Sequence, residues 1–236
     1  MAEPFDGKNA DYSKSPAIVL DEIERFKNSL KKVAKFEFTK SNASLLLYKI
    51  GVEHGIDSKE FLIAEAAMAG LGAKYVFGAK DLAFGRVDCG GLIYSALCKV
   101  VGISLGRESG YFGTVNIQAS GFGRKVGANE LDSIKTGDII SRSAKFGDYG
   151  HAVIVLNNDP ESKQITVIHA SSGVGKVNIH TYPYADFKSY YLEKNKHVLA
   201  ISSSEYEDFV KYFKTNFGTI AKNDENIANR PSRQGI

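Results

Sequence analysis

One cysteine and two histidines in this chain have the spacing and local context needed for nucleophilic catalysis. Cys89 directly follows Asp88, a good N-cap residue, and an apolar stripe from Leu92 to Val100 predicts a helix over about 89–101. The partial positive charge of a helix N-terminus favours the thiolate, the reactive form of cysteine. We therefore expect Cys89 to have a lowered pKa and to act as a nucleophile. The alternative is a small buried apolar residue.

The two histidines lie in neighbouring runs rich in Val and Ile. His151 opens the run HAVIVL, and His169 lies near the end of the run QITVIHA. If 151–156 and 164–170 pair as an antiparallel hairpin, the start of the first lies beside the end of the second. A base and a group that orients it would then be neighbours. The remaining histidines are expected to be surface or structural residues: His54, His180 and His197.

The second cysteine, Cys98, is expected to be structural. Nine helical steps place it on the face opposite Cys89, ~13.5 Å further along the axis. A disulfide needs Cα atoms within ~7 Å, so we expect none between these two cysteines. Two cysteines are also too few for a structural zinc site, and the expected chemistry needs no metal or organic cofactor.

The elements that position these residues are expected to be helices first and strands afterwards, which predicts an α+β fold. Close spacing of the strands predicts antiparallel pairing, and 85–88 is expected to be loop. A polar, flexible tail is expected from Thr219. The expected helices cover about 16–36, 43–54, 58–69, 89–101, 113–120 and 203–215, and the expected strands 138–142, 151–156, 164–170, 176–180 and 196–201.

Four short strings, taken in order, resemble the NlpC/P60 family of papain-like cysteine peptidases. They are Asp88-Cys89-Gly90-Gly91-Leu92, Gly137-Asp138-Ile139-Ile140, Gly150-His151-Ala152-Val153-Ile154 and Ile168-His169-Ala170. An Ala-rich helix and the lead-in Gly72-Ala73-Lys74-Tyr75-Val76-Phe77-Gly78 also match. The resemblance covers about residues 58–201.

The resemblance implies a role for each matched residue. Cys89 would be the nucleophile, His151 the base and His169 the third polar residue that orients it. Tyr75 matches the family tyrosine that helps to hold the oxyanion beside the backbone N–H of Cys89. The family usually has Ser after the cysteine, whereas this chain has Gly90.

The resemblance also implies a domain division and a substrate class. We expect an N-terminal helical extension over 1–57, a hydrolase domain over 58–202, and a C-terminal helix with a flexible tail over 203–236. The expected activity is a peptidoglycan endopeptidase or amidase acting on cell-wall stem peptides, in a secreted toxin effector or phage component. Two alternatives are a thioester-forming acyltransferase on the same scaffold and a non-catalytic binding module.

Composition limits the partners. The net charge of +3 is too small to indicate nucleic-acid binding. Nothing approaches the ~20 consecutive apolar residues of a membrane span. The N-terminus lacks the features of a secretory signal, so we expect a cytoplasmic protein or export that reads no such signal. A protein partner for the N-terminal helices is a further expectation.

Overall fold

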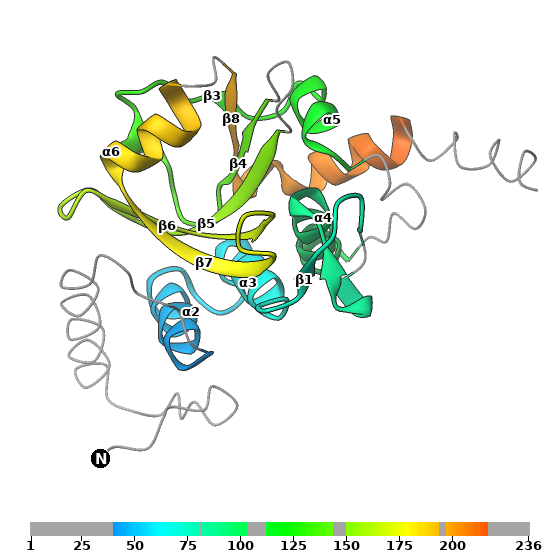
Figure 1. Ribbon diagram of the computed structural model, residues 1–236, viewed down its shortest axis with the longest axis horizontal. Helices are drawn as coiled ribbons and strands as arrows, with labels where there is room; N and C mark the ends of the chain where they lie inside the picture. The colour runs from blue at the N-terminus through cyan, green and yellow to red at the C-terminus, as the bar shows by residue number, and fades with distance from the viewer. Residues whose placement is uncertain (1–39, 81, 103–111, 144–149, 194–196, 217–236) are drawn as a thin grey trace, which may run out of the picture.

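A computed structural model describes residues 40–80, 82–102, 112–143, 150–193 and 197–216. The helix expected over 16–36 and the tail expected from Thr219 lie outside these residues. Within the described chain, eight strands form one curled sheet in the order β2-β1-β7-β6-β5-β4-β8-β3 (Figure 1). Their bounds are β1 Lys74–Tyr75, β2 Arg86–Val87, β3 Arg124–Lys125, β4 Ile139–Arg142, β5 His151–Asp159, β6 Gln164–Ser171, β7 Lys176–Pro183 and β8 Val198–Ile201.

The expected α+β fold is confirmed, with a mixed sheet. The five expected strands form β4 to β8 and pair antiparallel. The expectation of loop at 85–88 is wrong in part, because Arg86–Val87 pairs parallel with β1. β3 was not expected either, and it pairs antiparallel with β8. Two-residue edge strands are set by the neighbour they pair with and leave no alternating pattern in the sequence.

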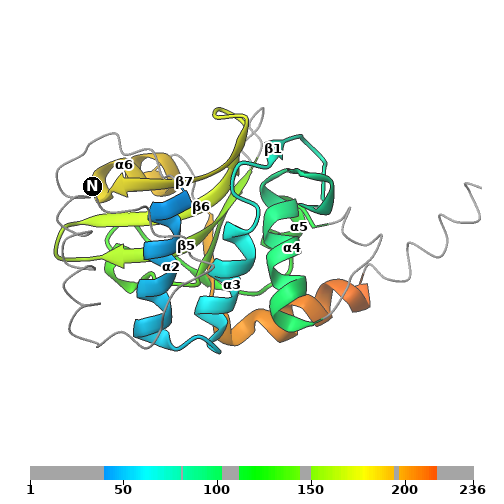
Figure 2. The ribbon, with the colours of Figure 1, turned by 90° about the horizontal axis from the view of Figure 1, so that it is seen from below.

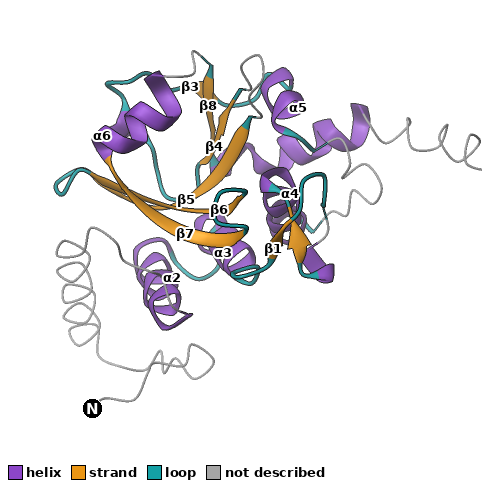
Figure 3. Cartoon of the chain, in the orientation of Figure 1, coloured by secondary structure: helices purple, strands orange, loops and turns teal. Residues whose placement is uncertain are grey.

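The helices cover the two faces of the sheet (Figures 2 and 3). On one face, α2, α3 and α4 lie side by side and share a core with the even-numbered residues of β5 and β6. On the other face, the segment beginning with α6 packs on the odd-numbered residues of the same strands. The helix bounds are α2 Lys40–His54, α3 Lys59–Met68, α4 Cys89–Val101, α5 Thr114–Ala119, α6 Tyr184–Phe187 and a last helix over 206–216.

The cap residues of α4 define where the helix begins and ends. The Asp88 side chain accepts a hydrogen bond from the backbone N–H of Gly91 at 2.7 Å, which fixes Cys89 as the first helical residue. Gly102 ends the helix in the left-handed conformation, at φ 68°. Ser58 caps α3 in the same way, through the N–H of Phe61 at 3.1 Å. The helices expected over 58–69 and 89–101 are confirmed.

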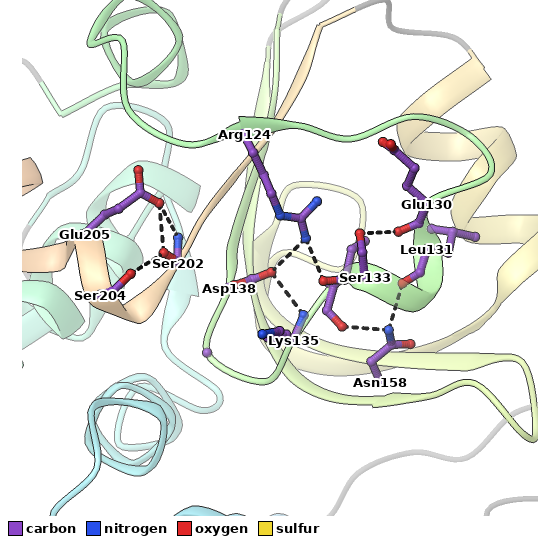
Figure 4. A network of polar contacts seen from close by, with 12 residues as sticks. Arg124, Glu130, Leu131, Ser133, Lys135, Asp138, Asn158, Ser202, Ser204 and Glu205 are labelled. Atoms are coloured by element: carbon purple, nitrogen blue, oxygen red, sulfur yellow. Dashed lines mark hydrogen bonds and ion pairs between the residues drawn. The ribbon is translucent and has the colours of Figure 1, made fainter.

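A polar network holds the connection that leads into β4 (Figure 4). The Asp138 carboxylate accepts from the backbone N–H of Lys135 at 3.0 Å, and lies 3.5 Å from the Arg124 guanidinium. Arg124 also donates to the carbonyl oxygen of Ser133 at 2.7 Å. The Asn158 amide ties β5 to the same connection through the carbonyl oxygen of Leu131 at 2.8 Å. These contacts give the Gly137-Asp138 string a structural role.

Candidate active site

Cys89 lies at the point where α4 meets the sheet. Its side chain is half-buried, and backbone hydrogen bonds from Ala152 and Gly90 reach the sulfur. Ala152 follows His151 in β5, so this contact places the sulfur beside the first residues of that strand. The two cysteines are not joined by a disulfide, as expected from their spacing.

The expectation of a lowered Cys89 pKa is wrong. Burial, and then the negative charge of Asp88, raise the pKa of the Cys89 thiol above its ordinary value. The backbone N–H groups and the Lys80 ammonium act in the opposite direction, but they do not outweigh the loss of water around the sulfur. A helix N-terminus lowers a thiol pKa only where the sulfur stays partly hydrated, and the helical pattern alone cannot report that burial.

The expected neighbourhood of the two histidines is confirmed. β5 and β6 pair antiparallel with Ile154 opposite Ile168, which brings the start of β5 to the end of β6. The Nε2 atom of His151 lies 2.8 Å from the Nδ1 atom of His169, and the two rings meet at 66°. His151 also lies against the ring of Tyr191, with 6.3 Å between the centroids.

Both histidines are neutral near pH 7. Burial lowers the pKa of His151 to about 3, with smaller contributions from His169 and Arg142. Burial, followed by the charge of His180, lowers the pKa of His169 to about 4. His180 was expected to be a surface or structural residue, and its side chain is exposed on β7, where its charge acts on His169. It also packs against Tyr182, with ring centroids 4.0 Å apart.

Tyr75 lies in β1, on the Cys89 side of the site. Its backbone N–H donates to the carbonyl oxygen of Gly175 at 2.8 Å, which anchors β1 beside the end of the β6–β7 connection. Burial, then the charges of Cys89 and Asp88, raise the pKa of the Tyr75 hydroxyl to about 12. The hydroxyl is therefore protonated and lies within electrostatic range of the sulfur.

Lys80 is a site residue that the sequence reasoning missed. Its ammonium lies 2.7 and 2.5 Å from the two carboxylate oxygens of Asp88. The two side chains are only 12% and 8% exposed, and Asp88 also accepts from the N–H of Gly78 at 3.0 Å. These contacts close the segment from Gly78 to Asp88 into a loop at the start of α4. A Lys and an Asp eight positions apart in an expected loop give no periodic signal.

The glycine after Cys89 has a steric reason. A Cβ atom at Gly90 would overlap the backbone carbonyl oxygen of Phe112, and one at Gly91 would overlap that of Ala79. The backbones at Phe112 and Ala79 therefore pass in direct contact with the first turn of α4. Gly90, where the family usually has serine, thus lies where the backbone of Phe112 approaches α4 closely. The sequence alone could not show this approach.

A surface pocket is formed largely by residues of the Gly78–Asp88 loop, Lys80 among them. It is lined by Val76, Ala79, Lys80, Phe84 and Arg86. The Phe84 side chain is 75% exposed at its rim. Within the described residues, His, Cys, Asp and Glu side chains form no group of three or more that could hold a metal ion. Among the described helices, none has the length and apolar composition needed to cross a bilayer.

Comparison with known proteins assigns the chain to a family. The model of the NlpC/P60 family matches residues 72–196, more than half of the 236 residues. The chain therefore belongs to the NlpC/P60 family, as the four strings had indicated. A search of curated proteins gave no match.

Two solved structures are similar to this chain. The NlpC/P60 domain of peptidoglycan hydrolase SagA is 24% identical, with a TM-score of 0.38 over 52% of this chain and 88% of that one. A Staphylococcus aureus protein of the NLP/P60 family, described as similar to lipoprotein, is 19% identical, with a TM-score of 0.39. That match covers 72% of this chain and 44% of the other.

Proposed function

We propose that this protein is a cysteine hydrolase that cleaves amide bonds in bacterial cell-wall peptides. The observation that carries the proposal is a pair of contacts at the start of β5. The Cys89 sulfur lies against the backbone of Ala152, next to His151, and the His151 ring lies 2.8 Å from His169. Membership of the NlpC/P60 family supports a cell-wall peptidase-type function.

The proposed reaction begins with a neutral thiol and a neutral imidazole. Nε2 of His151 is engaged with His169, so Nδ1 is the atom that accepts the thiol proton as sulfur attacks the amide carbonyl. The resulting imidazolium then protonates the leaving amine, and the acyl group remains on Cys89 as a thioester. Water attacks the thioester with His151 again as base, which releases the acid and restores the thiol.

The negative oxygen of the tetrahedral intermediate needs donors that are already in place. We assign this role to the backbone N–H of Cys89 and the hydroxyl of Tyr75. The raised pKa of Tyr75 keeps its proton available for donation throughout the reaction. Donors fixed by a helix terminus and a strand need no reorganisation when charge develops on the substrate oxygen.

The pocket beside Lys80 is the proposed site for part of the substrate. Its apolar lining and exposed Phe84 suit an aliphatic portion of a peptide, and Arg86 supplies a positive charge for a carboxylate. Lys80 itself is paired with Asp88, so we assign the substrate charge to Arg86.

Digestion of purified cell-wall peptides, followed by mass measurement of the products, tests the proposal. We expect wild-type protein to release fragments that have gained water. Cys89→Ala and His151→Ala should stay folded and lose nearly all turnover, whereas His169→Asn should retain more turnover than His169→Ala. His54→Ala, in an exposed position at the end of α2, is the matched control and should keep full turnover.

The same measurement separates the alternatives. Products that carry an acyl group on an added acceptor, in place of water, would identify a transferase. Wild-type turnover in a folded Cys89→Ala protein would exclude the cysteine mechanism altogether.

A further inference from the structure

Some buried side-chain polar atoms have no hydrogen-bond partner among the described residues, and two of them belong to the β6–β7 ladder. They are Nε2 of His169 and Oδ1 of Asn178. The two residues are direct cross-strand partners in the β6–β7 ladder. Directly opposed residues of an antiparallel pair have side chains on the same face, with Cβ atoms about 4.5–5.5 Å apart. The two unpaired atoms therefore belong to neighbouring side chains on the face that carries the histidines.

The chemistry of these two atoms is complementary in only one way. An amide oxygen can accept a hydrogen bond but cannot donate one, whereas an imidazole nitrogen does either, according to its tautomer. Buried polar groups are nearly always paired in folded proteins. Both atoms are satisfied if His169 carries its proton on Nε2 and donates it to Oδ1 of Asn178, directly or across one water molecule.

We propose that Asn178 is a positioning residue that sets the tautomers of both histidines. The inference rests on the proposed cysteine–histidine chemistry. With its proton on Nε2, His169 presents the lone pair of Nδ1 to His151, 2.8 Å away. His151 must then donate from Nε2, which leaves its Nδ1 unprotonated. Nδ1 is the atom that has to take the proton of Cys89.

The opposite arrangement would disable the base. If His169 carried its proton on Nδ1, it would donate to Nε2 of His151, and the His151 proton would move to Nδ1. The nitrogen assigned to the thiol would then already be protonated. An Asn178 amide turned by 180° would favour this pair of tautomers, because its NH₂ group would donate to Nε2 of His169. The two amide orientations therefore lead to opposite expectations.

The sharpest test reads the tautomers without reference to activity. In protein labelled with ¹⁵N-histidine, nitrogen–proton correlation spectra at pH 7 distinguish the two neutral forms of each ring. We expect both His151 and His169 to be protonated at Nε2 in the wild type, and Asn178→Leu to shift His169 toward a mixture. A wild-type His169 protonated at Nδ1 would overturn the proposal, even in a protein that hydrolyses nothing.

Kinetics supply the second readout. Asn178→Leu keeps the shape but cannot accept, so we expect kcat to fall roughly 10-fold or more, within the about 10²–10⁴-fold that a positioned base contributes. KM and melting temperature should change little. Asn178→Asp retains the acceptor and should keep most of the activity.

A cross-strand control is available on the same two strands. Thr181 hydrogen-bonds Thr166 at 2.9 Å in the same ladder, three register positions away from the His169–Asn178 pair. Thr181→Val should therefore keep its kcat. An unchanged kcat in Asn178→Leu, or equal losses in the Leu and Asp variants, would contradict the assignment. Should Asn178→Leu fail to fold, the tautomers of the wild type and of Asn178→Asp still decide the question.

Discussion

The Cys89 thiol and the His151 imidazole are both neutral in the resting protein, because burial raises the pKa of the thiol and lowers that of the imidazole. A thiolate–imidazolium pair would be stable only if the two charges attracted each other more strongly than their lost hydration. In the proposed mechanism, the proton therefore moves when the substrate carbonyl is attacked. Desolvation that disfavours a resting thiolate also strengthens the oxyanion donors once charge develops.

The raised thiol pKa predicts the pH dependence of alkylation. In a Cys98→Ser variant, in which Cys89 is the remaining thiol, iodoacetamide labelling should be slow at pH 7 and should rise steadily above pH 8. The reason is that only the thiolate reacts, and its fraction grows as pH approaches the pKa. Mass spectrometry after timed exposure measures the rate. A rate that is already constant between pH 6 and 8 would indicate a lowered pKa and contradict this account.

The close contact between the Phe112 backbone and the first turn of α4 predicts that Gly90 does not tolerate a side chain. Gly90→Ser restores the residue usual in the family but places its Cβ on the carbonyl oxygen of Phe112. We expect a loss of about 1–3 kcal/mol in the free energy of unfolding, the usual effect of overpacking. Gly113→Ala is the control, because a Cβ there meets no atom within 4 Å. Equal stability of the two variants in urea denaturation would show that the 112 segment yields easily.

The loop from Gly78 to Asp88 is the element that couples the start of α4 to its surroundings. Lys80→Met removes one member of a buried ion pair, and Asp88 keeps its two backbone N–H donors. We expect the free energy of unfolding to fall by about 3 kcal/mol relative to the wild type, the low end for breaking a buried pair. Lys211→Met, at an exposed pair with Asp208, should cost less than about 1 kcal/mol.

The alkylation rate of Cys89 is a second measurement on the Lys80→Met variant. Lys80 lowers the pKa of Cys89, so alkylation of Cys89 at pH 8 should be slower in Lys80→Met than in the wild type. Faster labelling would mean that loosening of the loop, rather than the lost charge, governs access to the sulfur.

Strong local patterns made the central elements predictable from the sequence. The cap at Asp88, the apolar stripe of α4 and the Val- and Ile-rich runs of β4 to β8 each carry a periodic or chemical signal. The hairpin argument also placed His151 beside His169. Features set by contacts distant in sequence could not be predicted: the pairing of β1 with β2, the Lys80–Asp88 pair, and the burial that reverses the expected Cys89 pKa shift.

At the scale of the whole molecule, α2 is part of the same core as α3 and α4. Ala43, Leu46 and Ile50 are nearly inaccessible to solvent and pack in that core. The Lys49 side chain also hydrogen-bonds Asn157 of β5. The division at residue 57 stays a prediction, and these contacts show what a truncation there would expose.

Two truncations test that division. Deleting 1–57 removes Leu46 and Ile50, whose burial is worth about 3–6 kcal/mol together, so we expect a large loss of stability. Deleting only 1–39 keeps these contacts and serves as the matched control. Thermal melting of both proteins makes the comparison. A shorter protein as stable as the control would show that α2 is dispensable to the core.

The buried histidines predict acid sensitivity of the whole fold. Unfolded histidines bind protons below about pH 6.5, whereas His151 and His169 resist protonation down to about pH 3 and about pH 4 when folded. The unfolded state therefore binds more protons in this window, and stability should fall as pH falls from 6.5 toward 4. Each histidine contributes up to about 1.4 kcal/mol per pH unit.

Urea denaturation at pH 7, 6 and 5 measures the slope. A His169→Gln variant lacks one of the two groups, so its stability should depend less steeply on pH. If the free energy of unfolding of His169→Gln depends on pH as steeply as that of the wild type, the acid sensitivity arises from other groups.

The separation of the site along the chain has a consequence for the order of synthesis. Cys89 and the proposed oxyanion donors lie within one stretch, 75–89, whereas the proposed base, its proposed orienting partner and Asn178 follow on β5 to β7. A ribosome exposes the first stretch well before the second. Under the proposed mechanism, the growing chain carries Cys89 without its complete set of partners until β5 to β7 have left the exit tunnel. Hydrolysis by that mechanism would begin only when synthesis of the sheet is nearly complete.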